Sequence, residues 1–336
     1  MQREVERNWS MLIRSNTGTN LARCCCLAKD NISVAMKSTL RYIGAAGYIN
    51  MRLPIRDYIQ LTKPTIMLLV LFTGAVALVL EGSLLQRPLL FALVLAGLYL
   101  TGGSANALNQ VFEREIDARM SRTRTRRPLP LGRLGATQAA IFSVTIGVLG
   151  VLLFGIFFNW LTALLSLATI LFYSLFYTLW LKPNTAQNIV IGGAAGAMAP
   201  VGAWTAASGH MALTPWLLFA IVFLWTPPHF WALAMFCKED YLKAKLPMMP
   251  VVKGDDATMR QIMAYTAVLI LVSLGMFTVG AGWLYVSSAL VLGLWLMKKA
   301  LDANRLRSTT ALRTLFGYSI VYLFALFTAM IVDSLV

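Results

Sequence analysis

The sequence predicts an all-α, polytopic membrane protein with nine transmembrane helices. Hydrophobic residues make up 58% of the 336 residues and charged residues only 13%, whereas soluble domains carry about 25% charged residues. Several apolar runs reach or approach the roughly 20 residues that a membrane-spanning helix needs. These runs are too long and too uniformly apolar for the strands of a membrane barrel. Because backbone groups in lipid must pair within the protein, helices are the structure that remains.

Nine apolar runs give the predicted spans, at residues 65–81, 88–109, 138–158, 160–181, 187–207, 213–236, 261–281, 283–299 and 313–334. Together they form one nine-helix membrane domain, which we place at residues 53–336. Residues 1–52 are polar and basic, and we expect them to form a disordered arm, with a targeting segment as the alternative. The arm contains Cys24, Cys25 and Cys26. Metal binding or lipid attachment is a weak interpretation of this cluster, because no CxxC pair or partner histidine accompanies it.

The net charge of +15 is distributed unevenly between the loops. In a soluble protein such a charge would suggest nucleic acid, but here we expect no nucleic-acid partner, because basic loops set membrane orientation. The loops after the second, fourth, sixth and eighth spans all carry lysine or arginine, whereas the opposite side carries only Arg87. Basic loops stay in the cytoplasm, so the N-terminus is predicted to be cytoplasmic. We expect a bacterial inner (plasma) membrane rather than a mitochondrial inner membrane, because the arm is short and contains acidic residues.

An acidic segment ends the second span. Asn109, Glu113 and Asp117 are spaced i, i+4 and i+8, so on a helix they share one face. Carboxylate and amide oxygens are costly near hydrocarbon and indicate a function there, and oxygen ligands are what Mg²⁺ prefers. The sequence therefore predicts a Mg²⁺ site, completed by Asp240 and Glu239 from across the bundle. The structural alternative is a helix end whose acids pair with nearby arginines at helical spacing.

Basic and aromatic residues near this segment predict a substrate site. Arginines bind phosphate oxygens well, although a role in membrane orientation explains some of them. Mg²⁺ can neutralise the charge of a leaving diphosphate, which favours an enzyme that ionises an allylic diphosphate so that an electron-rich carbon attacks the cation. Lys182, which ends the fourth span, joins the three residues above and Asp240 as a catalytic candidate. The candidates for substrate binding are Lys63, Arg122, Arg126, Arg127, Tyr173, Tyr177, His229 and Lys253.

Two further segments have both a structural and a functional interpretation. His229 follows Pro227 and Pro228 inside the sixth span, and we expect the prolines to break the helix and line a cavity. The alternative is a histidine that hydrogen-bonds to the interrupted backbone. The small residues 192–197 in the fifth span are typical of close helix packing, and the alternative is close approach of the backbone to a bulky, flat substrate.

These motifs resemble the UbiA-type membrane prenyltransferases, from about Asp57 to the C-terminus. The most specific pieces are Leu61-Thr62-Lys63-Pro64, the Asn109/Glu113/Asp117 pattern followed by Arg122-Thr123, Asn188 to Gly193, Trp225-Thr226-Pro227-Pro228-His229-Phe230-Trp231, and Asp240-Tyr241 leading to Pro247. The run from Trp225 to Trp231 indicates the branch of this superfamily that farnesylates haem. Two departures are Glu113, where the family usually has Asp, and Ala244, which leaves the second acidic motif with fewer carboxylates.

The resemblance implies nine helices around a central cavity, with farnesyl diphosphate as donor, haem B as acceptor, haem O and diphosphate as products, and Mg²⁺ as cofactor. It also carries the expectation of association with haem A synthase or terminal-oxidase assembly. It leaves open whether Arg126 or Arg127 binds the diphosphate. One alternative is prenylation of a quinone precursor or another ring acceptor. An alternative from another class is a transporter of an anionic solute, since a weak internal repeat between the second and sixth spans occurs in transporters too.

Overall fold

The computed structural model describes residues 55–336, which lie within one unit, Met51–Val336. The predicted arm at residues 1–52 and its three cysteines lie outside the described residues. Every regular element in the described part of the chain is helical. The predicted all-α fold is therefore confirmed.

Within residues 55–336, nine helical segments are long and apolar enough to cross a membrane. They are α4 (Pro64–Glu81), α5 (Pro88–Phe112), α8 (Ala136–Phe157), α9 with η1 and α10 (Trp160–Asn184), α11 (Asn188–Ser208), α12 (Leu213–Phe236), α15 with η2 (Gly254–Val279), α16 (Trp283–Leu306) and α17 (Thr309–Ser334). All nine predicted spans are confirmed. The seventh starts seven residues earlier than the predicted 261 and the eighth ends seven later than the predicted 299, because charged turns extend these helices beyond their apolar parts.

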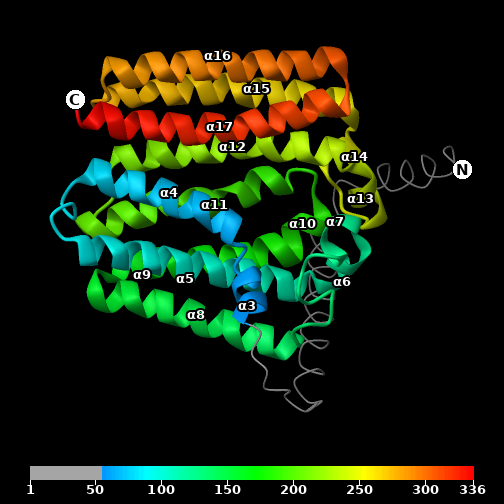
Figure 1. Cartoon of the computed structure of the whole chain (residues 1–336), viewed down its shortest axis with the longest axis horizontal. Coiled ribbons are helices and arrows are strands. Elements are labelled where there is room, and N and C mark those ends of the chain that lie inside the picture. Colours follow the sequence, from blue (N-terminus) through cyan, green and yellow to red (C-terminus); the bar gives the residue numbers. More distant parts are fainter. Residues whose placement is uncertain (1–54) are drawn as a thin grey trace, which may run out of the picture. The chain divides into compact units, whose positions relative to one another are not determined.

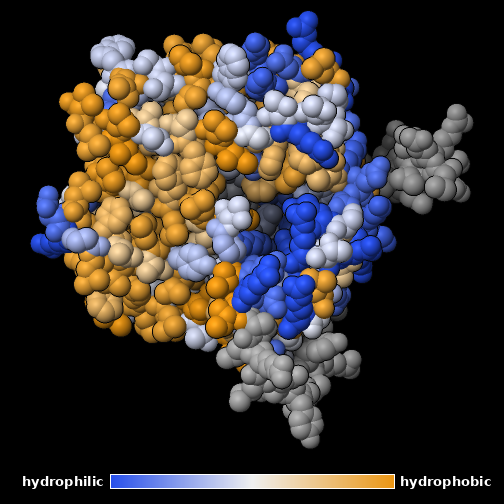
Figure 2. Space-filling model, viewed as in Figure 1, coloured by the Kyte–Doolittle hydropathy of each residue, from blue (hydrophilic) through white to orange (hydrophobic). Residues whose placement is uncertain are grey.

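Short helices gather at one end of the bundle, on the right of Figure 1. They are α6 (Arg114–Arg119), α7 (Ser121–Arg124), α10 (Lys182–Asn184), α13 (Lys238–Lys243) and α14 (Met249–Val252). Figure 2 shows hydrophilic side chains concentrated over this end, whereas hydrophobic side chains cover the middle of the bundle. We call it the polar end. The connections after α5, η1 and α12 lie at this end. Their charged residues would cost free energy if they entered hydrocarbon.

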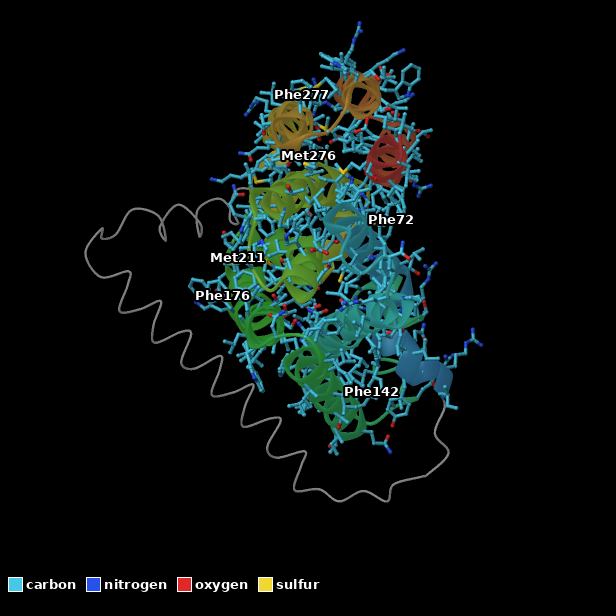
Figure 3. The ribbon with its side chains drawn as sticks, turned by 90° about the vertical axis from the view of Figure 1, so that its left-hand side faces the viewer. Phe72, Phe142, Phe176, Met211, Met276 and Phe277 are labelled. Carbon is cyan, nitrogen blue, oxygen red and sulfur yellow. The ribbon has the colours of Figure 1, made fainter. Side chains whose placement is uncertain are left out.

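The spans close into a ring in which α4 contacts α5, α11 and α17. Figure 3 views these helices nearly end on, with Phe72 of α4 facing α17. The rings of Phe72 and Phe324 stack there with centroids 4.8 Å apart. This contact joins the first span to the last.

The helix α11 packs tightly against α4 in one part and less tightly nearer the polar end. A Cβ on Gly74 of α4 would lie 3.7 Å from Cβ of Ala203, so α4 and α11 touch there. Gly196 shares that face of α11 nearer the polar end, yet it is exposed and a Cβ there would meet nothing within 4 Å. Figure 2 shows a hollow in the surface beside hydrophilic side chains of the polar end. The central cavity that the resemblance implies stays a prediction.

The small residues of α11 serve mainly for packing. A Cβ on Gly192 would lie 2.3 Å from the ring of Tyr177, and one on Gly193 would lie 3.0 Å from Thr226. Both glycines therefore allow neighbouring helices to approach closely. Gly196 differs, because it is exposed and a Cβ there would meet no atom within 4 Å.

The predicted break in the sixth span is wrong. The helix α12 runs without interruption from Leu213 to Phe236 with Pro227 and Pro228 inside it. The prolines remove two backbone N–H donors, but a helix buried among neighbours tolerates this loss because the surrounding spans hold it in place. Here α11, α15 and α17 all pack against α12.

Candidate active site

The acidic segment after α5 keeps one continuous face. The helix α5 ends at Phe112, but the backbone ladder continues, since Glu113 N–H donates to Asn109 O (3.0 Å) and Asp117 N–H donates to Glu113 O (2.8 Å). Asn109, Glu113 and Asp117 therefore share a face, and each is only 2% exposed. The three side chains point into the protein at the polar end, not toward lipid.

Three cations from separate segments meet these side chains. Nζ of Lys182 lies 2.5 Å from Oε1 of Glu113. Arg127 donates from Nη1 to Oδ2 of Asp117, and the same nitrogen lies 4.0 Å from Oε2 of Glu113. Nζ of Lys63 donates to Oδ1 of Asn109 at 2.8 Å. We call these six residues the charged cluster, although Asn109 itself is neutral: Asn109, Glu113, Asp117, Lys63, Arg127 and Lys182.

Burial and these charges shift the pKa values within the cluster. Burial lowers the pKa of Lys63 to about 7, and the neighbouring charge of Arg127 acts in the same direction. Burial acts to raise the pKa of Glu113, but Lys182 and the other cations outweigh it and hold that pKa below its usual value. At Asp117 burial outweighs Arg127 and raises the pKa. The two carboxylates are therefore electrostatically distinct.

Lys63 adopts an unusual backbone conformation at the start of α4. Its φ of 55° and ψ of 67° are left-handed, which is costly for a residue before proline. Two side chains of α5 fix the preceding carbonyls, since Asn106 Nδ2 donates to Thr62 O (3.2 Å) and Gln110 Nε2 donates to Leu61 O (2.9 Å). These bonds stabilise the corner that directs Lys63 into the cluster.

The arginine loop contributes one side chain to the cluster. Thr123 links the loop to the acidic segment, because its hydroxyl donates to Asp117 O (2.7 Å) and its carbonyl accepts from Arg127 N–H (2.9 Å). Arg127 is half-buried, whereas the side chains of Arg122 and Arg126 are exposed. The geometry therefore brings Arg127 to the carboxylates and leaves the other two candidates at the surface.

The fourth span ends in a ten-residue π-helix, η1 (Phe172–Leu181). Such helices are rare and often occur at functional sites. The rings of Tyr173 and Tyr177 stack with centroids 5.1 Å apart, and Lys182 follows at the end of η1. The π-helix therefore presents both predicted tyrosines and the predicted lysine from one segment.

Asp240 lies apart from the ion pairs of Glu113 and Asp117. It accepts hydrogen bonds from the hydroxyl of Ser121 and from N–H of Arg122 (3.2 Å), at the first turn of α7. The bond from Ser121 lowers the pKa of Asp240. No group of three or more His, Cys, Asp or Glu side chains within residues 55–336 is arranged to hold a metal. Lys253, another predicted site residue, is exposed at the end of α14.

His229 packs between helices α12 and α17. Its Nδ1 lies 2.7 Å from Oγ of Ser319. Its ring stacks between Trp225 (centroids 4.4 Å apart) and Phe316 (4.3 Å). The hydrogen-bond partner of the His229 ring is therefore the Ser319 side chain of the last span, not the α12 backbone beside the two prolines.

The model of the UbiA prenyltransferase family matches residues 70–328. The chain belongs to this family. The predicted resemblance is confirmed, and the match covers the seven spans from α5 to α16 completely and most of α4 and α17.

Relatives of this UbiA-family chain match nearly its whole membrane domain. A protein of Gloeobacter violaceus named protoheme IX farnesyltransferase is 49% identical over 285 residues, 84% of this chain and 92% of the relative. One of Erythrobacter litoralis with the same name is 48% identical over 284 residues, covering 83% and 92%.

Solved structures share the fold at low identity. A digeranylgeranylglyceryl phosphate synthase superposes with a TM-score of 0.70 at 16% identity, covering 83% of this chain and 98% of that one. A UbiA homologue from Archaeoglobus fulgidus, solved with GPP and Mg²⁺, gives 0.58 at 15% identity over 82% and 99%. The nine-helix fold is thus that of the family.

Several residues that build the site in this UbiA-family chain were not among the predicted site residues. They are Asn106, Gln110, Thr123 and Thr178. The bonds of Asn106, Gln110 and Thr178 join segments far apart in the sequence, so local spacing does not reveal them, whereas Thr123 bonds Asp117 six residues earlier. A polar side chain inside an apolar span is the one sequence feature that indicates such residues, and it applies to Asn106, Gln110 and Thr178.

Proposed function

We propose that this chain transfers the farnesyl group of farnesyl diphosphate to a vinyl carbon of haem B, giving haem O and diphosphate. The observation that carries the proposal is the charged cluster, which places three buried or half-buried cations and two carboxylates at the mouth of an apolar bundle. Protoheme IX farnesyltransferases at 45–49% identity support the choice of donor and acceptor.

The charged cluster suits a diphosphate. Lys182 and Arg127 pair with Glu113 and Asp117, and Lys63 has no carboxylate partner of its own, so a bound diphosphate would favour its charged form. Ammonium and guanidinium groups are the donors that bind phosphate oxygens. We infer that the diphosphate lies against these three side chains, with Arg127 rather than Arg126 as the arginine that binds it.

The carboxylates fit Mg²⁺ that is shared with a substrate. Mg²⁺ is usually held by one or two carboxylates together with phosphate oxygens. Glu113 and Asp117 are buried, and Nη1 of Arg127 lies near an oxygen of each, so one cation can reach both. Glu113, Asp117 and Oδ1 of Asn109 would hold the metal, which when bound neutralises charge on the leaving diphosphate. Asp240 would serve as a ligand only after releasing Ser121 and Arg122.

The reaction breaks the bond between C1 of farnesyl and the diphosphate oxygen, and the vinyl carbon forms the new carbon–carbon bond. Water then adds to the resulting cation and loses a proton. Water at the wrong stage would destroy the first cation, so a dry site is required. The stacked rings of Tyr173 and Tyr177 provide aromatic surface on the π-helix whose end carries Lys182 of the cluster. We infer that the two hydrophobic substrates meet there.

A direct assay tests the proposal. Purified protein in detergent or nanodiscs is incubated with haem B, farnesyl diphosphate and Mg²⁺, and pigments are separated by mass. We expect hydroxyethylfarnesyl haem, and none after removal of divalent metal with a chelator. A folded protein that yields no such product but prenylates a quinone precursor would overturn the acceptor. Transport of farnesyl diphosphate into vesicles without chemical change would overturn the enzyme class.

We further propose that the polar end faces the cytoplasm of a bacterium and that the chain lies in the inner membrane. The basic loops gather at this end, which favours a cytoplasmic N-terminus. A periplasm-dependent reporter fused after Val336 should be active, and one inserted at Gly132 in the arginine loop inactive. Association with haem A synthase or terminal-oxidase assembly stays a prediction, which co-purification from native membranes tests.

A further inference from the structure

Thr178 lies on the π-helix η1 and hydrogen-bonds to Asn109, the neutral member of the charged cluster. Its hydroxyl oxygen accepts a hydrogen bond from Nδ2 of Asn109 at 3.0 Å. The same hydroxyl donates to the carbonyl of Tyr173 at 2.7 Å. Thr178 is 6% exposed and Asn109 is 2% exposed. The pair is therefore shielded from water, which cannot readily replace either bond.

The two partners of the Asn109 amide fix which way it faces. In its protonated form Lys63 has only donors, so it can bind the oxygen of the amide but not its nitrogen. The hydroxyl of Thr178 has committed its one hydrogen to Tyr173 and can only accept, so it binds the nitrogen. Both neighbours require the same orientation, with Oδ1 toward Lys63 and Nδ2 toward Thr178.

The π-helix makes this arrangement available. In an α-helix a threonine hydroxyl bonds the carbonyl three or four residues earlier, as Thr266 does with Ile262 in α15. Thr178 instead bonds the carbonyl five residues earlier, which matches the spacing of a π-helix. The wider turn leaves the hydroxyl oxygen turned toward α5.

We propose that Thr178 is a positioning residue that holds the Asn109 amide with its oxygen toward the metal and diphosphate site. This inference rests on the proposed function, in which the Lys63 side chain leaves Asn109 and binds the diphosphate when the substrate is present. Thr178 is then the remaining partner that keeps Oδ1 directed at the metal. Without it, a buried amide N–H lacks a partner and the side chain rotates to find one.

Three variants test the role of Thr178. Thr178→Val keeps the shape and removes the hydroxyl, Thr178→Ser keeps the hydroxyl, and Thr266→Val is a matched control, since Thr266 is also buried and bonds only a backbone carbonyl four residues earlier. We expect Thr178→Val to raise the Mg²⁺ concentration for half-maximal activity about tenfold, as loss of a residue that orients a metal ligand does. Thr178→Ser and Thr266→Val should stay within about twofold of the parent.

A binding measurement separates this inference from the proposed reaction. Mn²⁺ binding in the presence of farnesyl diphosphate, followed by electron paramagnetic resonance without haem, should weaken about tenfold in Thr178→Val. Should the valine variant not insert, Thr178→Ala replaces it. Adding Asn109→Ala to either variant should abolish the difference, because the hydroxyl acts through that amide.

Equal Mn²⁺ affinity in the parent and the hydroxyl-free variant would overturn the positioning role, and so would an effect that persists beside Asn109→Ala. Failure of the parent to farnesylate haem B, with the Mn²⁺ results as expected, would instead overturn the proposed function and leave the positioning role of Thr178 in place.

Discussion

Two acidic segments end helices four spans apart at the polar end, and the structure uses them differently. The first, Asn109 to Asp117 after α5, is buried and holds Lys182 and Arg127. The second, Glu239 and Asp240 in α13, lies nearer the surface, where Asp240 binds Ser121 and the backbone of Arg122. Similar composition therefore does not give similar function. The surroundings of each segment decide what its carboxylates can bind.

The difference arises from where each helix ends. The helix α5 is packed against α4, α8 and α9, so its last turn faces the interior of the ring. The helix α13 follows the last turn of α12 and lies over the end of the bundle (Figure 1). Burial raises the pKa of Asp117, whereas the hydrogen bond from Ser121 lowers that of Asp240. Burial and ion pairs therefore set the charge state of the first segment, whereas Asp240 of the second segment hydrogen-bonds to the first turn of α7.

The largest effect is expected from Asp117→Asn. The amide has the same shape but cannot form an ion pair with Arg127 or provide a charged metal ligand. Haem farnesylation should therefore fall at least about 100-fold, which is typical when a group that acts mainly in the transition state is removed. Turnover is measured with saturating substrates, beside membrane insertion and the thermal unfolding midpoint. If Asp240→Asn reduced turnover as much as Asp117→Asn does, the contrast between the two segments would be lost.

A smaller effect separates two neighbouring arginines of the loop. Arg127→Met should reduce kcat/KM for farnesyl diphosphate about 10- to 100-fold, because a charge-assisted contact to phosphate of about 1.5–3 kcal/mol is lost. Arg126→Met is the matched control and should change it less than about threefold, since that side chain is exposed. Comparable losses in both variants would show that the loop acts through its total charge.

Much of the fold could be predicted from hydropathy, because a span must be apolar over its whole length. The shared face of Asn109, Glu113 and Asp117 followed from helical spacing. The inward position of Arg127 did not follow, because the loop is irregular and three arginines fit the same pattern. The prediction of a broken α12 was wrong, since the helix is continuous through both prolines. The sequence shows the two lost backbone N–H donors, but it does not show the packing against other helices that keeps α12 continuous.

Contacts between distant spans could not be predicted from spacing either. The bonds from Lys63 to Asn109 and from Asn109 to Thr178 join segments 46 and 69 residues apart. The π-helix that orients Thr178 has no clear signature in an aromatic, uniformly apolar segment. The candidate residues were therefore predictable by type, and their partners were not.

A moderate effect is expected from Asp240→Asn. The amide weakens the hydrogen bonds that Asp240 accepts from Ser121 and Arg122. Losing a helix cap costs about 1 kcal/mol, so α7 should unfold locally more often. Turnover should fall about fivefold, with faster amide hydrogen exchange at residues 121–124. A loss as large as that of Asp117→Asn, with exchange unchanged, would instead indicate direct metal ligation by Asp240.

The smallest effect is expected from Glu239→Gln, one residue away on α13. Glu239 is exposed, and substitutions at such positions seldom matter unless they disturb a specific contact. Turnover and the Mg²⁺ requirement should both stay within about twofold of the parent, which makes this variant the baseline for Asp240→Asn. If Glu239→Gln lowered turnover more than Asp240→Asn, the second segment would act through its negative charge at the cavity mouth. The capping bonds of Asp240 would then no longer explain the difference between the two segments.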